Sequence, residues 1–285
     1  MKLKLIYILL FLLSKLPLTV LYAIAKILKF TNTHILKYRK NIVNKNIRKT
    51  FPMLREREEE KLINTFYTHF FNTIVEIIKS INIEQSVLRK RVTIKNIDLL
   101  EKYLKRNKPI ILIGSHYANW EWIMLRISLI QNIKLSAIYK PIKHKEINEI
   151  LLRLRTKFGA KLIPLNRWKN FLLKARNKPN TYFFLSDQVP EKNYNSVRCN
   201  FLNQSTLFHK GAEKTAKLLN AKTFYIDVQK IYKSSTISKE SEGFYMIKFK
   251  ELDDEKLTID YVNNLEKTIL RKPAHWLWSH NRWKR

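Results

Sequence analysis

The sequence has a single cysteine, Cys199, among 285 residues. One thiol excludes an internal disulfide framework and is compatible with a reducing compartment. The chain also lacks the cysteine and histidine spacings of a zinc site. His275 and His280 lie close together in the carboxyl-terminal tail, but no supporting ligand set accompanies them. We therefore expect neither a metal site nor a cofactor.

Acidic residues are scarce, because 23 Asp and Glu stand against 55 Lys and Arg and leave a formal net charge of +32. Such an excess predicts attraction to anionic partners, which include nucleic acid, anionic lipid headgroups and acidic proteins. Lys, Ile and Asn are abundant throughout, so AT-rich coding can account for part of the charge. Long arginine-rich tracts and an obvious DNA-reading helix are absent, and we expect no nucleic-acid partner.

No uninterrupted apolar run reaches the roughly 20 residues that a membrane-spanning helix requires. Residues 1–30 are strongly apolar, but Lys15 and Pro17 interrupt them. The segment 5–25 can span a membrane only with Lys15 in its middle, and two short membrane-inserted helices with a bend near Pro17 are equally compatible. A signal peptide is disfavoured, because the apolar stretch continues well past a normal signal core.

The chain is long enough for one large domain with a full core. We expect residues 1–30 to anchor the chain to a membrane, with the flanking basic residues on the cytoplasmic side. Residues 31–285 should form a single domain, with a helical part at 31–100 and an α/β part at 108–285. Strands and helices alternate in that second part, which predicts an α/β fold with a mixed, partly parallel sheet flanked by helices.

The expected elements follow from apolar periodicity and from Gly, Pro and capping signals. The expected strands are 110–113, 134–140, 161–165, 181–185, 197–202, 223–232 and 243–250. The expected helices are 34–50, 54–83, 120–130, 144–158, 166–176, 212–220 and 255–270. A polar loop is expected at 203–211, and a second polar loop, rich in Ser, between the last two strands.

The stretch 108–122 carries the residues with the clearest chemistry. A buried strand at 110–113 should lead through a tight loop into a helix. Asn119 is a plausible N-cap, which places Trp120 at the first helical position. His116 then projects from a loop at the carboxyl end of a strand, where open α/β sheets usually carry their chemistry.

A histidine in that place can take a proton from a hydroxyl group. A carboxylate on its other ring nitrogen would fix the tautomer, and Glu121 is the candidate for this role. Backbone N–H groups at the helix amino end could bind a developing oxyanion. No Ser or Cys occupies a nucleophile-elbow context, so we infer direct transfer without a covalent enzyme intermediate. The alternative is a capping carboxylate beside a loop histidine without a catalytic role.

The string His-Tyr-Ala-Asn-Trp-Glu at 116–121 fits the His-x4-Glu/Asp signature of glycerolipid-type acyltransferases. Its Asn-Trp-Glu ending resembles the narrower lipid A biosynthesis acyltransferase family, whose late enzymes place secondary chains on lipid A and related lipids. The segments 46–52 and 273–285 also resemble that family, so the likeness covers nearly the whole chain. The tryptophans of 273–285 are expected to pack on the core or to lie at the membrane interface.

The resemblance implies further site residues. Asp187 and Gln188 follow a predicted strand, and in the family such a pair lines the cleft, where Asp187 could orient the acceptor or an arginine. The alternative for Asp187 is a loop cap. Arg155 lies in an Arg-x-Arg-x-x-Phe-Gly context that implies contact with a phosphate or headgroup. A solvated basic face is an equally good reading of Arg155.

A later block of the family places a polar loop and a glycine before a helix. Thr206 and Gly211 occupy that block here, and a helix amino end is physically suited to an anion. Glycerolipid acyltransferases carry an acid followed by Gly-Thr at this place, so the departure argues against a simple glycerol phosphate as acceptor. Lys140 and Asn119 complete the candidate substrate-binding set.

The resulting prediction is an O-acyltransferase at the cytoplasmic face of the inner membrane. His116 is its general base and Glu121 its orienting carboxylate. The family implies acyl carrier protein as the thioester donor, with acyl-CoA as the alternative, and a lipid A precursor or related membrane lipid as acceptor. Other open acceptors are another glycolipid, an aminolipid or a lysophospholipid. A thioester hydrolase and a basic, non-catalytic membrane-binding protein are the competing functions.

Overall fold

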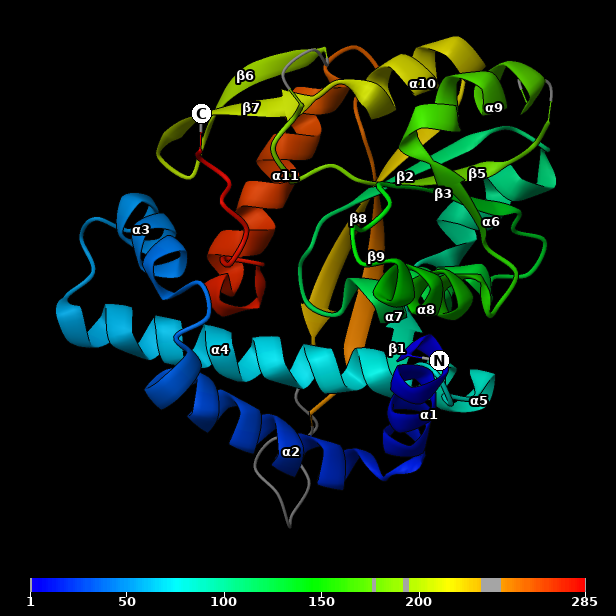
Figure 1. Ribbon diagram of the computed structural model, residues 1–285. Helices are drawn as coiled ribbons and strands as arrows, with labels where there is room; N and C mark the ends of the chain where they lie inside the picture. The colour runs from blue at the N-terminus through cyan, green and yellow to red at the C-terminus, as the bar shows by residue number, and fades with distance from the viewer. Residues whose placement is uncertain (1, 176–177, 192–194, 232–241, 285) are drawn as a thin grey trace.

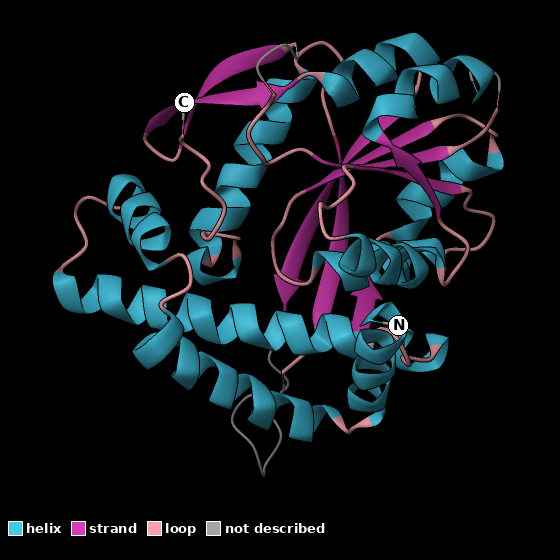
Figure 2. Ribbon diagram, viewed as in Figure 1, coloured by secondary structure: helices cyan, strands magenta, loops and turns pink. Residues whose placement is uncertain are grey.

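The computed structural model describes residues 2–175, 178–191, 195–231 and 242–284 (Figure 1). Its centre is a seven-stranded sheet flanked by helices (Figure 2), which confirms the predicted α/β class. The strands of this sheet are β1 (Val92–Ile94), β2 (Ile110–Gly114), β3 (Leu135–Tyr139), β4 (Lys161–Pro164), β5 (Thr181–Leu185), β8 (Lys222–Lys230) and β9 (Tyr245–Glu251). A separate hairpin consists of β6 (Ser196–Phe201) and β7 (Gln204–His209).

Helices precede the first strand of this sheet, connect most of its strands and follow its last strand. They are α1 (Lys2–Lys15), α2 (Leu18–Thr31), α3 (Lys40–Thr50), α4 (Glu56–Lys79), α5 (Gln85–Arg91), α6 (Ile97–Lys105), α7 (Trp120–Ser128), α8 (Lys145–Thr156), α9 (Trp168–Ala175), α10 (Gly211–Leu219) and α11 (Leu257–Arg271). Short η turns occupy Asn32–Leu36, Leu165–Arg167 and Pro273–His275.

The strand order β1-β9-β8-β2-β5-β3-β4 places β2 in the middle of the sheet. β8 and β9 run antiparallel, and the other neighbouring strands run parallel. Residues 110–113 of β2 are each at most 1% exposed, which explains the continuous apolar run. The register pairs Gly114 with Leu185. Residues just beyond these two positions must therefore emerge side by side at one edge of the sheet.

The apolar amino-terminal segment forms two helices rather than one. α1 ends at Lys15 and α2 begins at Leu18, so the break lies at Leu16-Pro17. This agrees with the expected bend near Pro17 between two short helices. No helix in the described part of the chain combines the length and apolarity needed to cross a membrane. α2 lies along α4 (Figure 1), where Leu21 and Ala25 pack against Val75.

Two predicted connections differ in the structure. The expected helix at 34–50 is interrupted, because Lys37 and Arg39 adopt left-handed φ values of 49° and 55° and α3 starts only at Lys40. The expected loop at 203–211 is instead largely strand β7. It pairs with β6 through a turn at Leu202 and Asn203, whose φ values are 52° and 61°, as primed hairpin turns require.

Two further differences concern the entry into the sheet and its last connection. Strand β1 lies within the part at 31–100 that was expected to be helical, and it adds to the sheet edge by parallel pairing with β9. Its three residues are too few to show a period in the sequence. The predicted Ser-rich loop between 232 and 243 lies, up to residue 241, outside the described residues.

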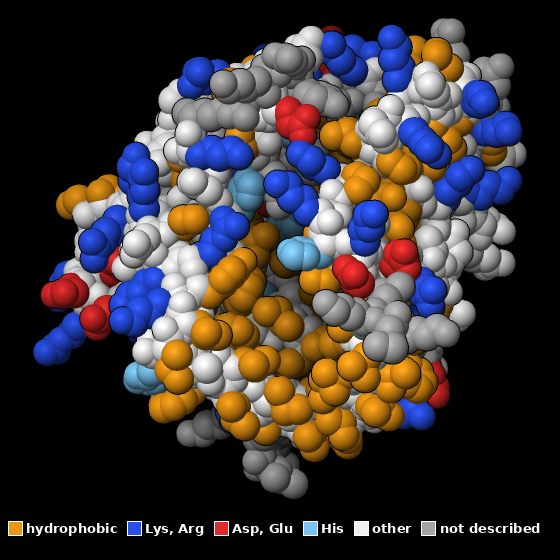
Figure 3. All heavy atoms as spheres, in the orientation of Figure 1, with side chains coloured by type: hydrophobic (Ala, Val, Ile, Leu, Met, Phe, Trp, Pro, Cys, Tyr) orange, Lys and Arg blue, Asp and Glu red, His pale blue; other side chains and the backbone are white. Residues whose placement is uncertain are grey.

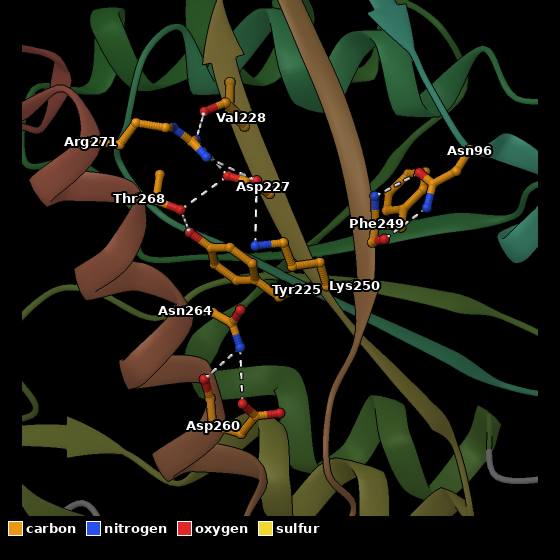
Figure 4. Close-up of polar contacts among 10 residues, drawn as sticks. All are labelled: Asn96, Tyr225, Asp227, Val228, Phe249, Lys250, Asp260, Asn264, Thr268 and Arg271. Carbon is orange, nitrogen blue, oxygen red and sulfur yellow. Dashed lines mark hydrogen bonds and ion pairs between the residues drawn. The ribbon is translucent and has the colours of Figure 1, made fainter.

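A polar cluster around the buried Asp227 anchors α11 on the sheet (Figure 4). Asp227 on β8 accepts hydrogen bonds from Arg271 Nη2 at 2.7 Å and Thr268 Oγ1 at 3.0 Å. Lys250 Nζ on β9 lies 3.5 Å from the same carboxylate. Burial alone would raise the pKa of Asp227, but Arg271 and Lys250 hold it below its ordinary value. The cluster matters for the site because the carboxyl-terminal tail continues directly from α11.

Candidate active site

His116 and Asp187 meet at the carboxyl ends of β2 and β5. His116 Nδ1 lies 2.8 Å from Asp187 Oδ1, and the His116 backbone N–H donates to Oδ2 at 3.0 Å. Trp276 Nε1 donates to Oδ2 as well, at 2.9 Å. Burial would raise the pKa of the Asp187 carboxyl, but the electrostatic interaction with His116 and these hydrogen bonds lower it to about 2. The carboxylate is therefore ionised throughout the physiological pH range.

This contact determines the state of the imidazole ring. An ionised carboxylate only accepts hydrogen bonds, so Nδ1 of His116 carries a proton, and in the neutral form of the ring Nε2 offers a lone pair. Gln188 Nε2 lies 3.3 Å from that nitrogen and can donate to it. The His116 side chain is 18% exposed, so part of the ring reaches the surface. The arrangement can act as a general base towards a hydroxyl group.

Glu121 does not make the contact that we expected. Its carboxylate forms a bidentate ion pair with Arg155, at 2.9 Å from Nε and 2.5 Å from Nη2, and accepts a hydrogen bond from Trp120 Nε1 at 3.2 Å. Trp120 and Glu121 are the first two residues of α7, so their side chains point in different directions. The Trp120 ring faces the His116 ring, with 5.2 Å between the centroids. Glu121 then faces α8 instead, and Asp187 orients the histidine.

The predicted N-cap at Asn119 is confirmed. Its Oδ1 accepts from the Trp122 backbone N–H at 3.0 Å, and α7 begins at Trp120. Its Nδ2 donates to Glu76 Oε2 at 2.7 Å. Asn119 is fully buried, so both ends of its amide are bonded within the protein.

The carboxyl-terminal tail forms one wall of the site. The Ala118 backbone N–H donates to His275 O at 2.9 Å, and the Leu277 N–H donates to His116 O at 3.1 Å. Trp276 is 2% exposed, as core packing predicts, yet its indole N–H also donates to the Asp187 carboxylate. Sequence reasoning missed this bond, because no local pattern links positions 89 residues apart.

A cavity of about 230 Å³ adjoins these residues. Its apolar lining includes Phe66, Phe70, Ile74, Ile77, Trp120 and Trp276. Trp120 also contacts the His116 ring, and Trp276 bonds to Asp187, so the cavity lies beside the His116–Asp187 pair. His69 and His275 belong to the same lining, and burial lowers both pKa values, that of His275 to about 3. Both rings are therefore neutral, and the cavity suits an apolar group.

The remaining predicted residues are Lys140, Thr206 and Gly211. Lys140 forms an ion pair with Glu191. Thr206 lies in β7, where its Oγ1 accepts from Trp283 Nε1 at 2.8 Å. Gly211 is the first residue of α10, which therefore starts one position before the expected helix. Within the described residues no hydrogen bond or ion pair joins these three to His116, and their contact with substrate stays a prediction.

Over the described ranges, no three His, Cys, Asp or Glu side chains are grouped as metal ligands.

Comparison with known proteins relates the whole chain to one group of enzymes. The family of bacterial lipid A biosynthesis acyltransferases matches residues 3–285. The chain is 25% identical over 254 residues to a lipid A biosynthesis palmitoleoyltransferase of Escherichia coli (strain K12). The aligned region covers 87% of this chain and 80% of that protein. A lipid A biosynthesis acyltransferase of Shigella flexneri shows the same identity and coverage.

Proposed function

The chain belongs to the bacterial lipid A biosynthesis acyltransferase family, and we propose that it transfers a fatty acyl chain from a thioester donor to a hydroxyl of a lipid A precursor or related membrane lipid. The observation that carries this proposal is the 2.8 Å contact between His116 Nδ1 and Asp187 Oδ1 beside an apolar cavity. The site therefore has a base that can take a proton from a hydroxyl group, and beside it a cavity that can hold an alkyl chain.

In the proposed reaction the acceptor hydroxyl displaces the Gln188 amide from His116 Nε2. The hydroxyl oxygen attacks the thioester carbonyl while the hydroxyl proton passes to His116 Nε2. Asp187 stabilises the imidazolium that forms. The tetrahedral intermediate then collapses, the C–O bond is kept and the C–S bond breaks. The imidazolium returns the proton to the leaving sulfur, so that the products are an ester and a free thiol.

The developing oxyanion needs a nearby donor. The Gln188 amide lies 3.3 Å from His116 Nε2 and is released when the hydroxyl arrives. It can then donate to the carbonyl oxygen, where donors aimed at developing charge contribute most to catalysis.

The Glu121–Arg155 pair has a different proposed role. Glu121 binds the Trp120 indole as well as Arg155, so it holds the ring that packs on His116. Although burial lowers the pKa of Arg155, Glu121 raises it, which keeps the guanidinium charged. The Arg155 side chain is 20% exposed, and a phosphate of the acceptor could still reach it.

We further propose that the acyl chain enters the cavity and that the amino-terminal helices hold the enzyme on the inner membrane, at its cytoplasmic face. Hydrophobic side chains gather over the lower part of the face shown in Figure 3. Large exposed apolar residues of α1, α2 and the following turn include Leu5, Leu9, Leu12, Ile27, Phe30 and Ile35. Such a patch fits a membrane interface, and its basic flanks suit anionic headgroups.

The donor is proposed to be an acyl carrier protein, with acyl-CoA as the alternative. The net charge of +32 favours association with an acidic carrier protein and with phosphorylated lipid. The division into an anchor at 1–30 and a domain at 31–285 is part of the same proposal.

The test is transfer of a labelled acyl group from carrier protein or CoA to a lipid A precursor in detergent micelles. His116→Ala should reduce transfer about 10²–10⁴-fold, the usual contribution of a general base. His144→Ala replaces an exposed histidine and serves as the control. Release of free fatty acid without an acceptor would identify a hydrolase instead. Lipid binding without transfer by the wild type would leave only the non-catalytic alternative.

A further inference from the structure

Glu76 is a fully buried carboxylate outside the pair described above. It lies on α4 and is 0% exposed. Tyr22 Oη donates to its Oε1 at 2.9 Å, while Asn119 Nδ2 and Tyr245 Oη each donate to its Oε2 at 2.7 Å. A buried carboxylate is tolerated only when such donors satisfy it. The three donors come from α2, from the N-cap of α7 and from β9, so one side chain joins three segments.

On one side this carboxylate reaches the catalytic loop. Asn119 uses its Nδ2 on Glu76 and its Oδ1 on the Trp122 backbone N–H, so the same amide holds α4 and caps α7. The Trp122 indole N–H adds a bond to the Glu76 carbonyl at 2.9 Å. Ala118, between His116 and Asn119, has a φ of 56°, a conformation that a residue other than glycine keeps only when its neighbours impose it.

On the other side the carboxylate reaches helix α2. The backbone at Gly243 closes over the Tyr22–Glu76 bond with a φ of 74°. A Cβ there would lie 2.3 Å from Tyr22 Oη and 3.2 Å from Glu76 Oε1. The backbone at Gly243 therefore packs directly on the bond between the hydroxyl and the carboxylate, and it leaves no room there for a side chain.

We propose that Glu76 is a positioning residue that ties α2, through Tyr22, to the loop from His116 to Glu121, so that docking of α2 on α4 sets the loop geometry needed for transfer. The inference rests on the proposed function. It follows that Glu76 acts on turnover rather than on binding, because it touches Asn119 and not the reacting atoms. The helix that carries exposed Val20, Ile27 and Phe30 thereby communicates with the catalytic loop.

The first test compares Glu76→Met with Glu76→Gln. Methionine has similar length but accepts no strong hydrogen bond, whereas glutamine keeps one oxygen for Asn119 and Tyr245 and can donate to Tyr22 Oη. We expect Glu76→Met to lower kcat about 30-fold or more with little change in KM, and Glu76→Gln to restore most of the activity. Equal losses in the two variants, or a loss confined to KM, would overturn the proposal.

Tyr22→Phe tests the α2 arm and keeps the test valid if Glu76→Met does not fold. It removes one hydroxyl and should lower kcat about 3- to 10-fold. Tyr103→Phe is the matched control, since it removes a hydroxyl that makes only a 3.4 Å contact with Glu251. Full activity of Tyr22→Phe would remove α2 from the proposed link.

Asn119→Ser tests whether Glu76 acts through the N-cap. Serine retains a capping oxygen but lacks the N–H that donates to Glu76. If both residues serve one link, kcat of the double variant Asn119→Ser/Glu76→Met should match that of the poorer single variant, rather than the product of both losses. Additive losses would show two independent effects and contradict the proposal.

Amide hydrogen exchange provides a readout that requires no substrate. The Ala118 N–H bonds to His275 O and the Trp122 N–H bonds to Asn119 Oδ1. In Glu76→Met and Tyr22→Phe we expect these two amides to exchange about tenfold faster, with little change in the core strand 110–113. Unchanged exchange would overturn the proposal even if transfer is observed. Faster exchange without any transfer in the wild type would instead count against the proposed function alone.

Discussion

His116 Nδ1 and Asp187 Oδ1 are 2.8 Å apart, although 71 positions separate the two residues in the chain. The contact follows from the parallel pairing of β2 with β5, which sets Gly114 opposite Leu185. His116 lies two positions after Gly114 in the chain, and Asp187 lies two positions after Leu185. The histidine of one short motif is thus oriented by the carboxylate of another, while Glu121 of its own motif pairs with Arg155.

Asp187→Asn should abolish most activity while keeping the fold. The amide can donate to His116 Nδ1 and so favour the tautomer whose Nε2 carries a proton, which cannot act as a base. We expect kcat to fall about 10²–10⁴-fold, and far-ultraviolet circular dichroism to stay unchanged. A loss below about threefold would remove Asp187 from the proposed machinery.

Glu121→Gln should reduce stability as well as activity. The Glu121 side chain is 4% exposed and Arg155 is 20% exposed, so loss of the carboxylate leaves a largely buried guanidinium unpaired. The free energy of unfolding should fall by about 3–5 kcal/mol in urea denaturation. The double variant Glu121→Met/Arg155→Met should recover much of this loss. A cost below about 1 kcal/mol for the single variant would indicate an ordinary surface pair.

Stability should depend on pH through His275. Burial, with the charges of Lys230 and Lys272, lowers the pKa of His275 to about 3. Its folded-state pKa lies below the unfolded value near 6.5, so the stability from the neutral ring is present above pH 6.5 and is lost as pH falls. At pH 5 the loss should be about 2 kcal/mol. Denaturation at several pH values should show a smaller acid-side slope in His275→Phe, and an identical slope would contradict the assignment.

Gly243→Ala and Gly159→Ala form a matched pair. Both glycines have positive φ, 74° and 87°, so alanine strains the backbone similarly at each. A Cβ at Gly159 meets nothing within 4 Å, whereas one at Gly243 would collide with Tyr22 Oη at 2.3 Å. We expect Gly243→Ala to lower the melting temperature and kcat well beyond Gly159→Ala. Equal effects would show that backbone strain alone explains both.

Ile77→Trp should shift the chain-length preference of the enzyme. Ile77 lines the apolar cavity, and a larger side chain removes space that a long acyl chain would occupy. The ratio of kcat/KM for a short over a long acyl donor should rise about 10- to 100-fold. Leu173→Trp, at an exposed position of α9, is the control. An unchanged ratio would place the acyl chain elsewhere.

Much of the fold could be predicted because its signals are local. The apolar runs at 110–113 and 181–185 predicted two central strands, and the Asn119 cap placed the start of α7 correctly. Strand β7 was missed because its polar residues resemble a loop until they pair with β6, and β1 because it has only three residues. Pairing between distant segments supplied what their own patterns lack.

By itself the sequence determined the α/β class, the family and the histidine at the end of a central strand, because apolar periodicity, capping and motif spacing act within a few residues. Only the tertiary structure decided which carboxylate meets that histidine. Asp187 reaches His116 and Glu76 reaches Asn119 from separate segments, while Trp276 binds Asp187 from a third. Strand register and helix packing bring these side chains together. The five-residue spacing of His116 and Glu121 did not predict where the Glu121 side chain points. The left-handed turn at Ala118 and the start of α7 direct it away from His116.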